Sequence, residues 1–299
     1  MFYKNEKHEE DYLVRANANE EIIAWAITSK NLVEHARQIH NLSPICTAAL
    51  GRSMSAALMM GNNLKNEQDV LTLQFNGNGP MRGLVVSANN KGEVKGYTKE
   101  TDIILPPNAA QHLNVGGAIG EGTLTVIRDY GLKDPYVSTT QLQTGEIAED
   151  LTYYFASSEQ TPSVVALGVL MNKDVTVRRA GGIIVQLMPY CPEASIARLE
   201  RNLRKLYALT DLLEEGMTPE DMLQFILEGF DVNITEKKPV KFQCNCGRER
   251  SEQVLISIGK KELTKLRDED HEITLNCQFC GSAYHFDEKD IDELINQID

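Results

Sequence analysis

Four of the six cysteines lie in two short motifs near the end of the 299-residue chain. The first is a Cys-x-Cys pair, Cys244 and Cys246, and the second is a Cys-x-x-Cys pair, Cys277 and Cys280. Each pair is followed by glycine, which suits a tight metal-binding turn in which backbone N–H groups point at the sulfur of the first cysteine. A closed structural zinc site takes four thiolates in a tetrahedron. We therefore predict one Zn²⁺ bound by all four cysteines.

Other kinds of site use similar motifs. A thioredoxin-like redox enzyme needs its Cys-x-x-Cys at a helix N-terminus after a strand, whereas Cys280 is followed by GSAYHF, which predicts a turn and extended chain. A nucleic-acid-binding zinc ribbon needs a basic surface, whereas residues 240–299 carry eight Lys or Arg against thirteen Asp or Glu. His271 and His285 are alternative ligands, but four thiolates complete the set, so we expect both side chains at the surface or behind the ligands.

The composition favours a soluble cytoplasmic protein. With a net charge of −13 and a pI of about 5.0, the chain is a poor partner for nucleic acid or anionic membranes. The first residues, MFYKNEKHEEDYLV, lack the pattern of a signal peptide, and no apolar run reaches the roughly 18 residues of a membrane span. In the cytoplasm, closely paired thiols are more often metal ligands or redox centres than structural disulfides.

Residues 1–189 predict an α+β domain with mixed or antiparallel sheets and packed helices. A strand is expected over residues 22–29. A helix follows Ser43, with Pro44 in its first position, and ends at Gly61. Its small and apolar residues surround the axis, so we expect it to be buried. The later strands are separated by glycine- and asparagine-rich turns rather than by regular helices, which favours α+β over a doubly wound fold.

Residues 190–239 predict a helical linker. One long helix is expected over residues 192–216, and a second begins with Thr218 as N-cap and Asp221 as the capping-box acid. Residues 231–240 are expected to be an exposed connector. The long helix carries an apolar stripe of Ile196, Leu199, Leu203, Leu206, Leu209 and Leu213.

Residues 240–299 predict a separate small unit that contains the four cysteines. We expect a short strand at QVLISI, a helix near KKELTKL and a last helix capped by Asp287. A unit of this size with so few large apolar residues has a marginal core and needs a metal or a disulfide to stabilise it. Cys46 is expected to act as a small buried hydrophobe, and Cys191 as a bystander open to an adventitious disulfide.

The whole chain resembles the redox-regulated 33 kDa heat-shock chaperone family, the 33 kDa chaperonins. The spacing of the four cysteines matches the family's redox switch. The first domain adds DLTYYFASSEQTPSVVALGV and GNGPMRGLVV, which are family signatures. The signature residues are Tyr154, Ser158, Glu159, Gln160, Gly79, Arg82 and Gly83.

The resemblance implies an ATP-independent holdase of the stress response and not an enzyme. Its reduced, zinc-bound form would be inactive. Oxidative stress would convert the cysteines to the disulfides Cys244–Cys246 and Cys277–Cys280, of which the short Cys-x-Cys loop should be strained. Zinc loss would unfold the switch domain and the linker, exposing surface that binds unfolded or partly folded client proteins. The linker residues expected to become exposed are Leu199, Leu203, Leu206 and Phe225.

Two further expectations concern assembly and the competing function. A homodimer favoured on oxidation is one option for the assembly. The alternative function is a zinc-binding thiol-disulfide oxidoreductase, which would turn over disulfides instead of suppressing aggregation. No phosphate-binding loop of the Gly-x-x-x-x-Gly-Lys-Ser/Thr type is present in the sequence.

Overall fold

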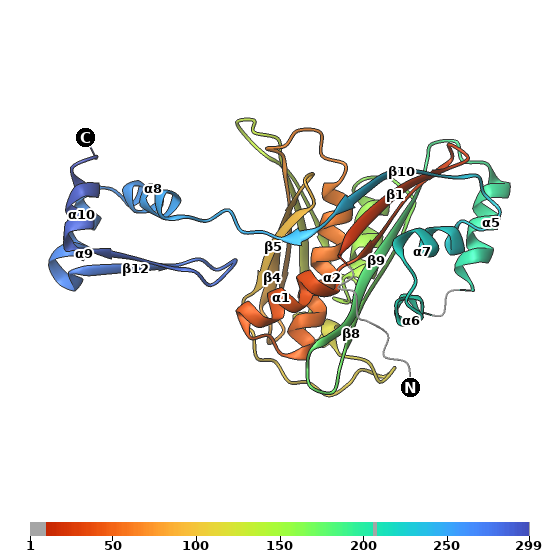
Figure 1. The fold of residues 1–299 in the computed structure, drawn as a ribbon, viewed down its shortest axis with the longest axis horizontal. Coiled ribbons are helices and arrows are strands. Elements are labelled where there is room, and N and C mark those ends of the chain that lie inside the picture. The colour runs from red at the N-terminus through yellow and green to blue at the C-terminus, as the bar shows by residue number, and fades with distance from the viewer. Residues whose placement is uncertain (1–9, 206–207, 299) are drawn as a thin grey trace. The chain divides into compact units, whose positions relative to one another are not determined.

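The structure is a computed structural model that describes residues 10–205 and 208–298. The chain divides into two compact units, Met1–Gln243 and Cys244–Asp299. Its architecture is mixed α+β, with antiparallel sheets and packed helices, as predicted (Figure 1). In the described ranges, no helix has both the length and the apolarity needed to cross a membrane.

The first unit contains a five-stranded antiparallel sheet in the order β10-β1-β2-β9-β8. Its strands are β1 (Tyr12–Ala18), β2 (Ile22–Thr28), β8 (Ser163–Met171), β9 (Val177–Leu187) and β10 (Val232–Pro239). Residues along β1 and β2 are buried alternately on the two faces, and neither face is left to solvent. This is why IIAWAIT is an almost unbroken apolar run.

A second sheet has the order β11-β5-β4-β3-β6-β7. Its strands are β3 (Val70–Gly77), β4 (Gly83–Asn89), β5 (Glu93–Thr98), β6 (Gly122–Asp129), β7 (Tyr136–Gln141) and β11 (Lys241–Phe242). All neighbouring pairs are antiparallel except β11 with β5, which are parallel. Strands β3, β4 and β5, which follow one another in the sequence, therefore lie side by side as a meander within this sheet.

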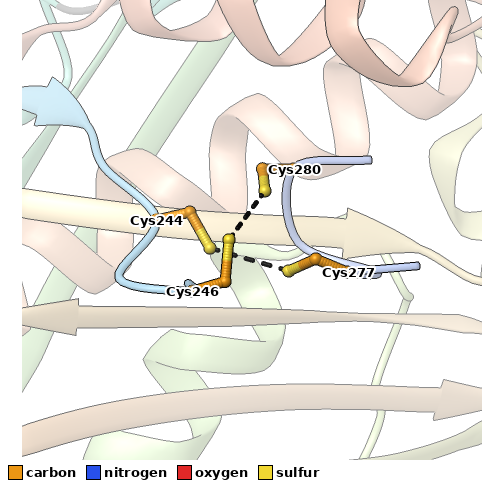
Figure 2. A group of neighbouring side chains, drawn as sticks. All are labelled: Cys244, Cys246, Cys277 and Cys280. Carbon is orange, nitrogen blue, oxygen red and sulfur yellow. Dashed lines mark hydrogen bonds between the residues drawn. The ribbon is translucent and has the colours of Figure 1, made fainter. Parts of the chain in front are cut away.

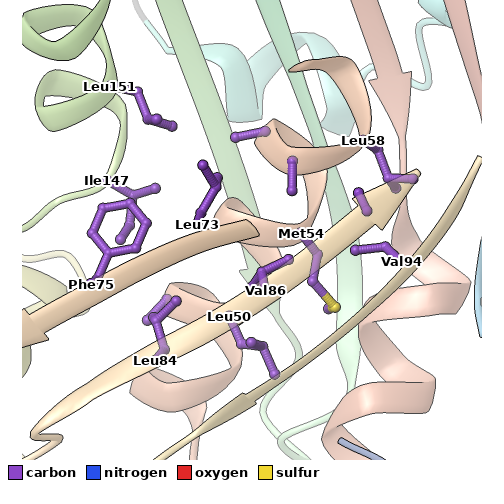
Figure 3. Packing of buried hydrophobic residues seen from close by; sticks show 14 of the residues in the cluster. Leu50, Met54, Leu58, Leu73, Phe75, Leu84, Val86, Val94, Ile147 and Leu151 are labelled. Atoms are coloured by element: carbon purple, nitrogen blue, oxygen red, sulfur yellow. The ribbon is translucent and has the colours of Figure 1, made fainter. Parts of the chain in front are cut away.

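Helix α2 (Pro44–Gly61) lies between the two sheets and contacts strands of both (Figure 1). Leu50, Met54 and Leu58 of α2 pack beside Val86 and other apolar residues of the second sheet (Figure 3). The prediction of a buried helix is confirmed, because 16 of its 18 residues are buried. Burial of one large aliphatic side chain stabilises the fold by about 1.5–3 kcal/mol. Because α2 buries several such side chains, it contributes much of the stability of this core.

Three further helices lie around this core. They are α1 (Lys30–His40), α3 (Val115–Ile119) and α4 (Ala148–Ser157). Asp150, at the start of α4, accepts hydrogen bonds from the backbone N–H groups of Gln143, Thr144 and Ile147. These bonds fix the loop that enters α4, because they satisfy N–H groups that otherwise have no partner.

The other face of the five-stranded sheet is covered by α5 (Glu193–Leu203), α6 (Leu209–Glu214) and α7 (Pro219–Ile226). The helices bury residues that include Leu199, Leu213 and Leu223 against alanine and β-branched residues of the sheet. The predicted Thr218–Asp221 capping box is present at the start of α7. The predicted linker segment is therefore packed against the sheet.

The prediction of one helix over residues 192–216 is wrong. Helix α5 ends at Leu203, and α6 begins at Leu209. The break allows α5 to pack against α7 while α6 packs against β8 and β9. Leu206, which the apolar stripe included, lies outside the described residues. Periodicity alone could not reveal the break, because the two short helices carry leucines in a nearly continuous repeat.

The prediction of an exposed connector over residues 231–240 is also wrong. These residues form β10, which pairs with β1 over almost its whole length, from Tyr12 opposite Pro239 to Ala18 opposite Val232. The charged run in β10 resembles a loop, but β10 is the outer strand of the sheet and its side chains are mostly exposed. Pairing with β1 therefore outweighs the weak preference of these charged residues for a loop.

The second unit is a small α+β unit. It consists of α8 (Arg248–Ile258), α9 (Lys260–Asp270), the hairpin β12 (Glu272–Asn276) and β13 (Ala283–Asp287), and α10 (Glu288–Ile295). The last helix is capped by Asp287, as predicted. The strand predicted at QVLISI is wrong, because these residues belong to α8. The run was too short to distinguish a strand from a helix. The buried core is Leu255, Leu263, Phe286, Ile291, Leu294 and Ile295.

Replacing Gly168 in β8 tests how closely α6 packs on the sheet. A Cβ atom at this position would lie 2.8 Å from the methyl carbon of Thr210 in α6. We expect Gly168→Ala to displace α6 and to lower the free energy of unfolding by about 1–3 kcal/mol, measured by urea denaturation. The matched variant Gly168→Ala with Thr210→Ser lacks that methyl group and should recover most of the loss. Equal destabilisation of both variants would contradict this packing.

Candidate metal centre

The two cysteine motifs lie in turns of the second unit. Cys244 and Cys246 precede α8, and Cys277 and Cys280 form the turn between β12 and β13 (Figure 2). The hairpin turn is closed by the backbone N–H of Cys277, which donates to the carbonyl of Ser282 at 2.9 Å. The two motifs therefore face each other although about thirty residues separate them in the sequence.

The four sulfur atoms converge on one point. All four lie within 4.8 Å of one another. Cys244 Sγ lies 3.7 Å from Cys277 Sγ, and Cys246 Sγ lies 3.3 Å from Cys280 Sγ (Figure 2). Sulfur atoms bound 2.3 Å from one tetrahedral Zn²⁺ would be about 3.8 Å apart. The donor set and its spacing therefore fit a metal ion that prefers four thiolates.

Backbone groups surround the sulfurs as a metal-binding turn requires. Burial raises the pKa of the Cys277 thiol, while the N–H groups of Phe279 and Cys280 lower it. Burial raises the pKa of Cys244 to about 12, against a hydrogen bond from the N–H of Cys246. Burial also raises the pKa of Cys280, but hydrogen bonds from Ser282, Cys246 and Cys277 together outweigh it and hold this pKa at about 7. Four thiolates this close repel one another, so a bound cation would stabilise their ionised forms.

A tyrosine supports the cluster from the hairpin. The hydroxyl of Tyr284 in β13 donates to Cys246 Sγ at 3.1 Å. Neither histidine belongs to the cluster: the Nδ1 atom of His285 is 2.9 Å from the Thr274 hydroxyl, and His271 ends α9. Both histidine side chains are exposed, as expected. Sequence reasoning did not identify Tyr284, because an aromatic residue in a strand gives no specific signal of such a contact.

Arg248, the first residue of α8, contacts both the hairpin and the last helix. Its guanidinium donates to the carbonyl of His285 at 2.8 Å, pairs with Asp290 at 2.8 Å and lies 4.5 Å from the centre of the Phe286 ring. Arg248 follows Cys246 by two residues, and Phe286 belongs to the small core. The position of the first cysteine motif is therefore coupled to the packing of the second unit.

The two remaining cysteines lie apart from the cluster. Cys46 is completely buried in α2, as predicted, and its thiol lies 3.4 Å from the carbonyl oxygen of Glu100. Cys191 is partly exposed and precedes α5. Both are free thiols.

The predicted linker residues differ in burial. Leu199 is 4% exposed and packs on the sheet, while Leu203 and Phe225 are half-buried at the edge of the same cluster. Met222 and Leu223 of α7 are fully buried there, so they contribute more to the contact than Phe225 does.

A polar contact holds α7 in place, and sequence reasoning missed it. Tyr12 in β1 donates its hydroxyl to Glu220 at 2.7 Å, and Lys237 in β10 pairs with Glu220 at 2.8 Å. The ammonium group of Lys237 also lies 4.0 Å from the centre of the Tyr12 ring. These residues are far apart in the sequence, so no local pattern could have linked them.

Comparison with known proteins places the chain in a family. The family model described as "Hsp33 protein" matches residues 11–287. A 33 kDa chaperonin of Lachnoclostridium phytofermentans is 49% identical over 96% of this chain and 99% of its own length. A 33 kDa chaperonin of Agathobacter rectalis is 47% identical over 95% of this chain and 99% of its own length. The chain belongs to the Hsp33 family.

A solved Hsp33 structure has the same fold. The crystal structure of the 33 kDa chaperonin from Thermotoga maritima matches with a TM-score of 0.88 at 34% sequence identity, covering 97% of this chain and 99% of that one. Three of the residues on which the resemblance rested, Tyr154, Glu159 and Gly83, have structural roles in the first unit. Tyr154 donates to Glu159, and Arg128 donates to both. Gly83 has a φ of +120° and lies against the Phe75 carbonyl, where a side chain would not fit.

Metal analysis tests the site. We expect the reduced protein to carry one Zn²⁺ per chain, because the four sulfurs fit one tetrahedral ion. Cys277→Ser should weaken zinc binding at least about tenfold, because losing a ligand should cost no less than losing a residue that only supports a ligand, which costs about 10–100-fold. His285→Ala is the matched control and should bind zinc like the wild type. Elemental analysis that finds no zinc, or a Cys277→Ser variant of full affinity, would contradict the site.

Proposed function

We propose that this chain is a redox-regulated, ATP-independent holdase chaperone that binds unfolded or partly folded proteins and acts without catalysis in the cytoplasm. The observation that carries the proposal is the four-cysteine cluster at one point of a unit with a very small core. Membership of the Hsp33 family, with relatives named 33 kDa chaperonin, supports the chaperone role.

Zinc is the ion we assign to Cys244, Cys246, Cys277 and Cys280. A structural zinc site supplies folding free energy, about 10–16 kcal/mol in small peptides at neutral pH. The buried core of the second unit has six residues, so the cysteines are the natural place for such additional stabilisation. In the reduced state the four thiolates would hold the hairpin turn against the chain that enters α8.

Oxidation would remove this stabilisation. Two thiolates lose two electrons to hydrogen peroxide and form one disulfide, and the peroxide takes up two protons and is reduced to two water molecules. Two such steps convert the four cysteines into Cys244–Cys246 and Cys277–Cys280, the pairing favoured by their closeness in sequence. A disulfide sulfur no longer binds zinc as a thiolate does, so each step removes two of the four ligands.

The chain connects the cluster to the linker segment. Only Gln243 separates β11 from Cys244, and only Val240 separates β10 from β11. Strand β10 carries Lys237, which holds Glu220 of α7. Unfolding of the second unit would leave β11, of only two residues, as the next element to detach, and loss of β10 would then remove one partner of the α7 contact.

Release of α5, α6 and α7 would expose two apolar surfaces. One is the buried side of the helices, which includes Leu199, Met222 and Leu223. The other is the sheet face beneath them. The predicted exposure of Leu199, Leu203 and Phe225 belongs to this proposal, with the more deeply buried residues of α7 added. These surfaces would bind apolar segments of client proteins, and an oxidised homodimer is compatible with the same exposure.

The alternative function, a thiol-disulfide oxidoreductase, lacks a supporting observation. Cys277 and Cys280 lie in a β-hairpin turn and not at a helix N-terminus, where a helix dipole would stabilise the thiolate. Disulfide exchange with turnover would favour this alternative, whereas suppression of aggregation without turnover favours the holdase.

Zinc chelation should unfold the second unit and leave the first unit folded. Under reducing conditions, a strong chelator should abolish amide protection in residues 244–299 and leave α2 and the central strands of the first unit protected. The reason is that the second unit has a six-residue core, whereas α2 alone buries 16 residues. Amide hydrogen exchange measures both regions at once. Equal loss of protection in the two units would contradict a separate, metal-dependent unit.

Light scattering of a denatured client protein tests the function. Peroxide-treated protein should suppress aggregation, and reduced, zinc-bound protein should not. Glu220→Gln should weaken the contact of α7 with Lys237, lower the peroxide dose or time required for activity, and leave zinc content unchanged. Glu215→Gln, which changes an exposed charge beside α6, is the matched control. Equal activity of the reduced and oxidised wild-type proteins would contradict the proposal.

A further inference from the structure

A cavity of about 390 Å³ lies between one end of the five-stranded sheet and the turn that joins α6 to α7. Its sheet wall includes Tyr12 at the start of β1, Thr28 at the end of β2 and Arg179 near the start of β9. Its helix wall includes Leu213 of α6 and Met217 of the turn. Sites for small molecules have volumes of about 300–1,000 Å³, so the cavity is large enough for one.

The strand register places Arg179 on the side of the sheet that α6 covers. Gly181 lies two residues further along β9, and a Cβ atom there would be 3.0 Å from Cδ2 of Leu213 in α6. Alternate residues of a strand share a face, so Arg179 lies on the same face as Gly181. Thr28 is the direct partner of Gly181 in β2 and belongs to this face too. Both polar residues of the sheet wall are therefore positioned by regular strand pairing.

The guanidinium of Arg179 lacks the partner that a half-buried cation usually has. Its Nε atom is buried, and no hydrogen-bond acceptor reaches it within the described residues. The adjacent Arg178, by contrast, is exposed and donates to Glu214 at 2.7 Å. A buried donor without a partner costs free energy. An acceptor that entered the cavity would recover part of this cost at Arg179.

The charges of the lining favour an anion. Three cations and two carboxylates line the cavity, namely Lys30, Arg179, Lys237, Glu10 and Asp11. Asp11 already accepts a hydrogen bond from the backbone N–H of Leu32 at 2.7 Å, and burial raises its pKa to about 7, so its charge is reduced at neutral pH. Lys237 is engaged with Glu220. Arg179 and Lys30 are therefore the cations that attract a ligand.

The helix wall supplies apolar surface on the other side of the cavity. Leu213 and Pro219 are buried, and Met217 is half-buried with a side chain that adapts to different shapes. A planar carboxylate matches the two parallel N–H donors of a guanidinium. A phosphate dianion would require more cations and would be repelled by Asp11 and Glu10. The cavity is thus complementary to a molecule with one carboxylate and one apolar end.

We propose that this cavity binds a small organic carboxylate with an aliphatic or aromatic body, and that the bound ligand holds α6 and the start of α7 on the sheet. The carboxylate lies at Arg179, and the apolar body contacts Leu213 and Met217. The two walls separate when the helices leave the sheet, so only the docked form binds the ligand. At a concentration about a hundred times the Kd, the equilibrium shifts about a hundredfold toward the docked form. The ligand thereby opposes oxidative release, a consequence that rests on the proposed function.

Isothermal titration calorimetry of the reduced, zinc-bound, full-length protein tests the site with phenylpropionate. The neutral phenylpropionamide has almost the same shape but should bind about tenfold more weakly, because it lacks the charge-assisted hydrogen bonds. Acetate should also bind more weakly than phenylpropionate, since it leaves the helix wall uncovered. Arg179→Gln should raise the Kd for phenylpropionate about tenfold, and Arg179→Lys, which keeps the charge, should bind with intermediate affinity. Lys173→Gln, which removes an exposed cation between β8 and β9, is the matched control and should bind like the wild type.

Amide hydrogen exchange locates the ligand. Phenylpropionate should slow the exchange of residues 209–226 in the reduced wild type but not in Arg179→Gln. Should Arg179→Gln not fold, Lys30→Gln at the exposed start of α1 provides a second test and should raise the Kd about threefold. Equal binding of the carboxylate and its amide, full affinity of the Arg179 and Lys30 variants, or protection confined to another part of the chain would overturn the inference. Binding that appears only after deletion of residues 1–9 would also overturn it, because the whole chain would then not bind the ligand.

Activation by peroxide in the presence of phenylpropionate tests the effect on release. The wild type should require a higher peroxide dose or a longer time to suppress aggregation, whereas Arg179→Gln should respond as it does without ligand. An unchanged dose despite bound ligand would overturn the effect on release. Ligand binding at α6 and α7 combined with oxidised protein that never suppresses aggregation would reject the holdase and retain the site. An active oxidised holdase that binds no phenylpropionate would reject the site alone.

Discussion

The five-stranded sheet is apolar on both faces, and the first unit is organised around this constraint. A sheet of this kind must be covered twice, since an uncovered face of Ala, Ile and Val residues would be exposed to water. One cover is α2, which is held between two sheets and shares their continuous core. The other is a set of three short helices, α5, α6 and α7, whose outward faces are open to solvent. The two covers therefore differ in how many contacts hold them, although each buries one face of the same sheet.

The second unit depends on a different kind of interaction. Its two cysteine turns are far apart in the sequence, and its buried core is too small to fix both of them firmly. The turns are positioned by specific contacts: the closed hairpin turn, Tyr284 beside Cys246, and Arg248 between α8 and the hairpin. These contacts bring four sulfurs together, but they do not remove the mutual repulsion of four thiolates. With a metal bound to the four sulfurs, stability and metal affinity would be aspects of one equilibrium in this unit.

The sequence predicted the features that depend on local chemistry. The cysteine motifs, the buried helix with Ser43 and Pro44 at its start, the capping box at Thr218 and the cap at Asp287 each follow from a few neighbouring residues. The features that it did not predict depend on distant partners. Strand β10 forms because β1 offers it an edge, and the long helix is interrupted where the chain turns to pack on β8 and β9.

The site was partly predictable for the same reason. The two cysteine motifs predict a common site, because two closely spaced cysteine pairs in one chain are typical of a shared metal ion or of disulfides. The hydroxyl of Tyr284 and the guanidinium of Arg248 act through the folded hairpin, and residues of these types occur throughout the sequence. The cavity between the sheet and the turn from α6 to α7 was likewise hidden, since Thr28, Arg179 and Met217 are far apart in the sequence and no local pattern links them.

The sheet face beneath α5, α6 and α7 mixes small and branched apolar residues. Ala16, Ala18, Ala24, Ala26, Gly168 and Gly181 lie among Val14, Ile22, Ile183 and Val185. An aliphatic surface of this kind presents few groups that require a hydrogen-bonding partner. Discrimination between ligands requires a shaped pocket or unpaired polar groups. Were the three helices to leave this face, contact with it would therefore depend on the apolar area of the incoming segment more than on its sequence.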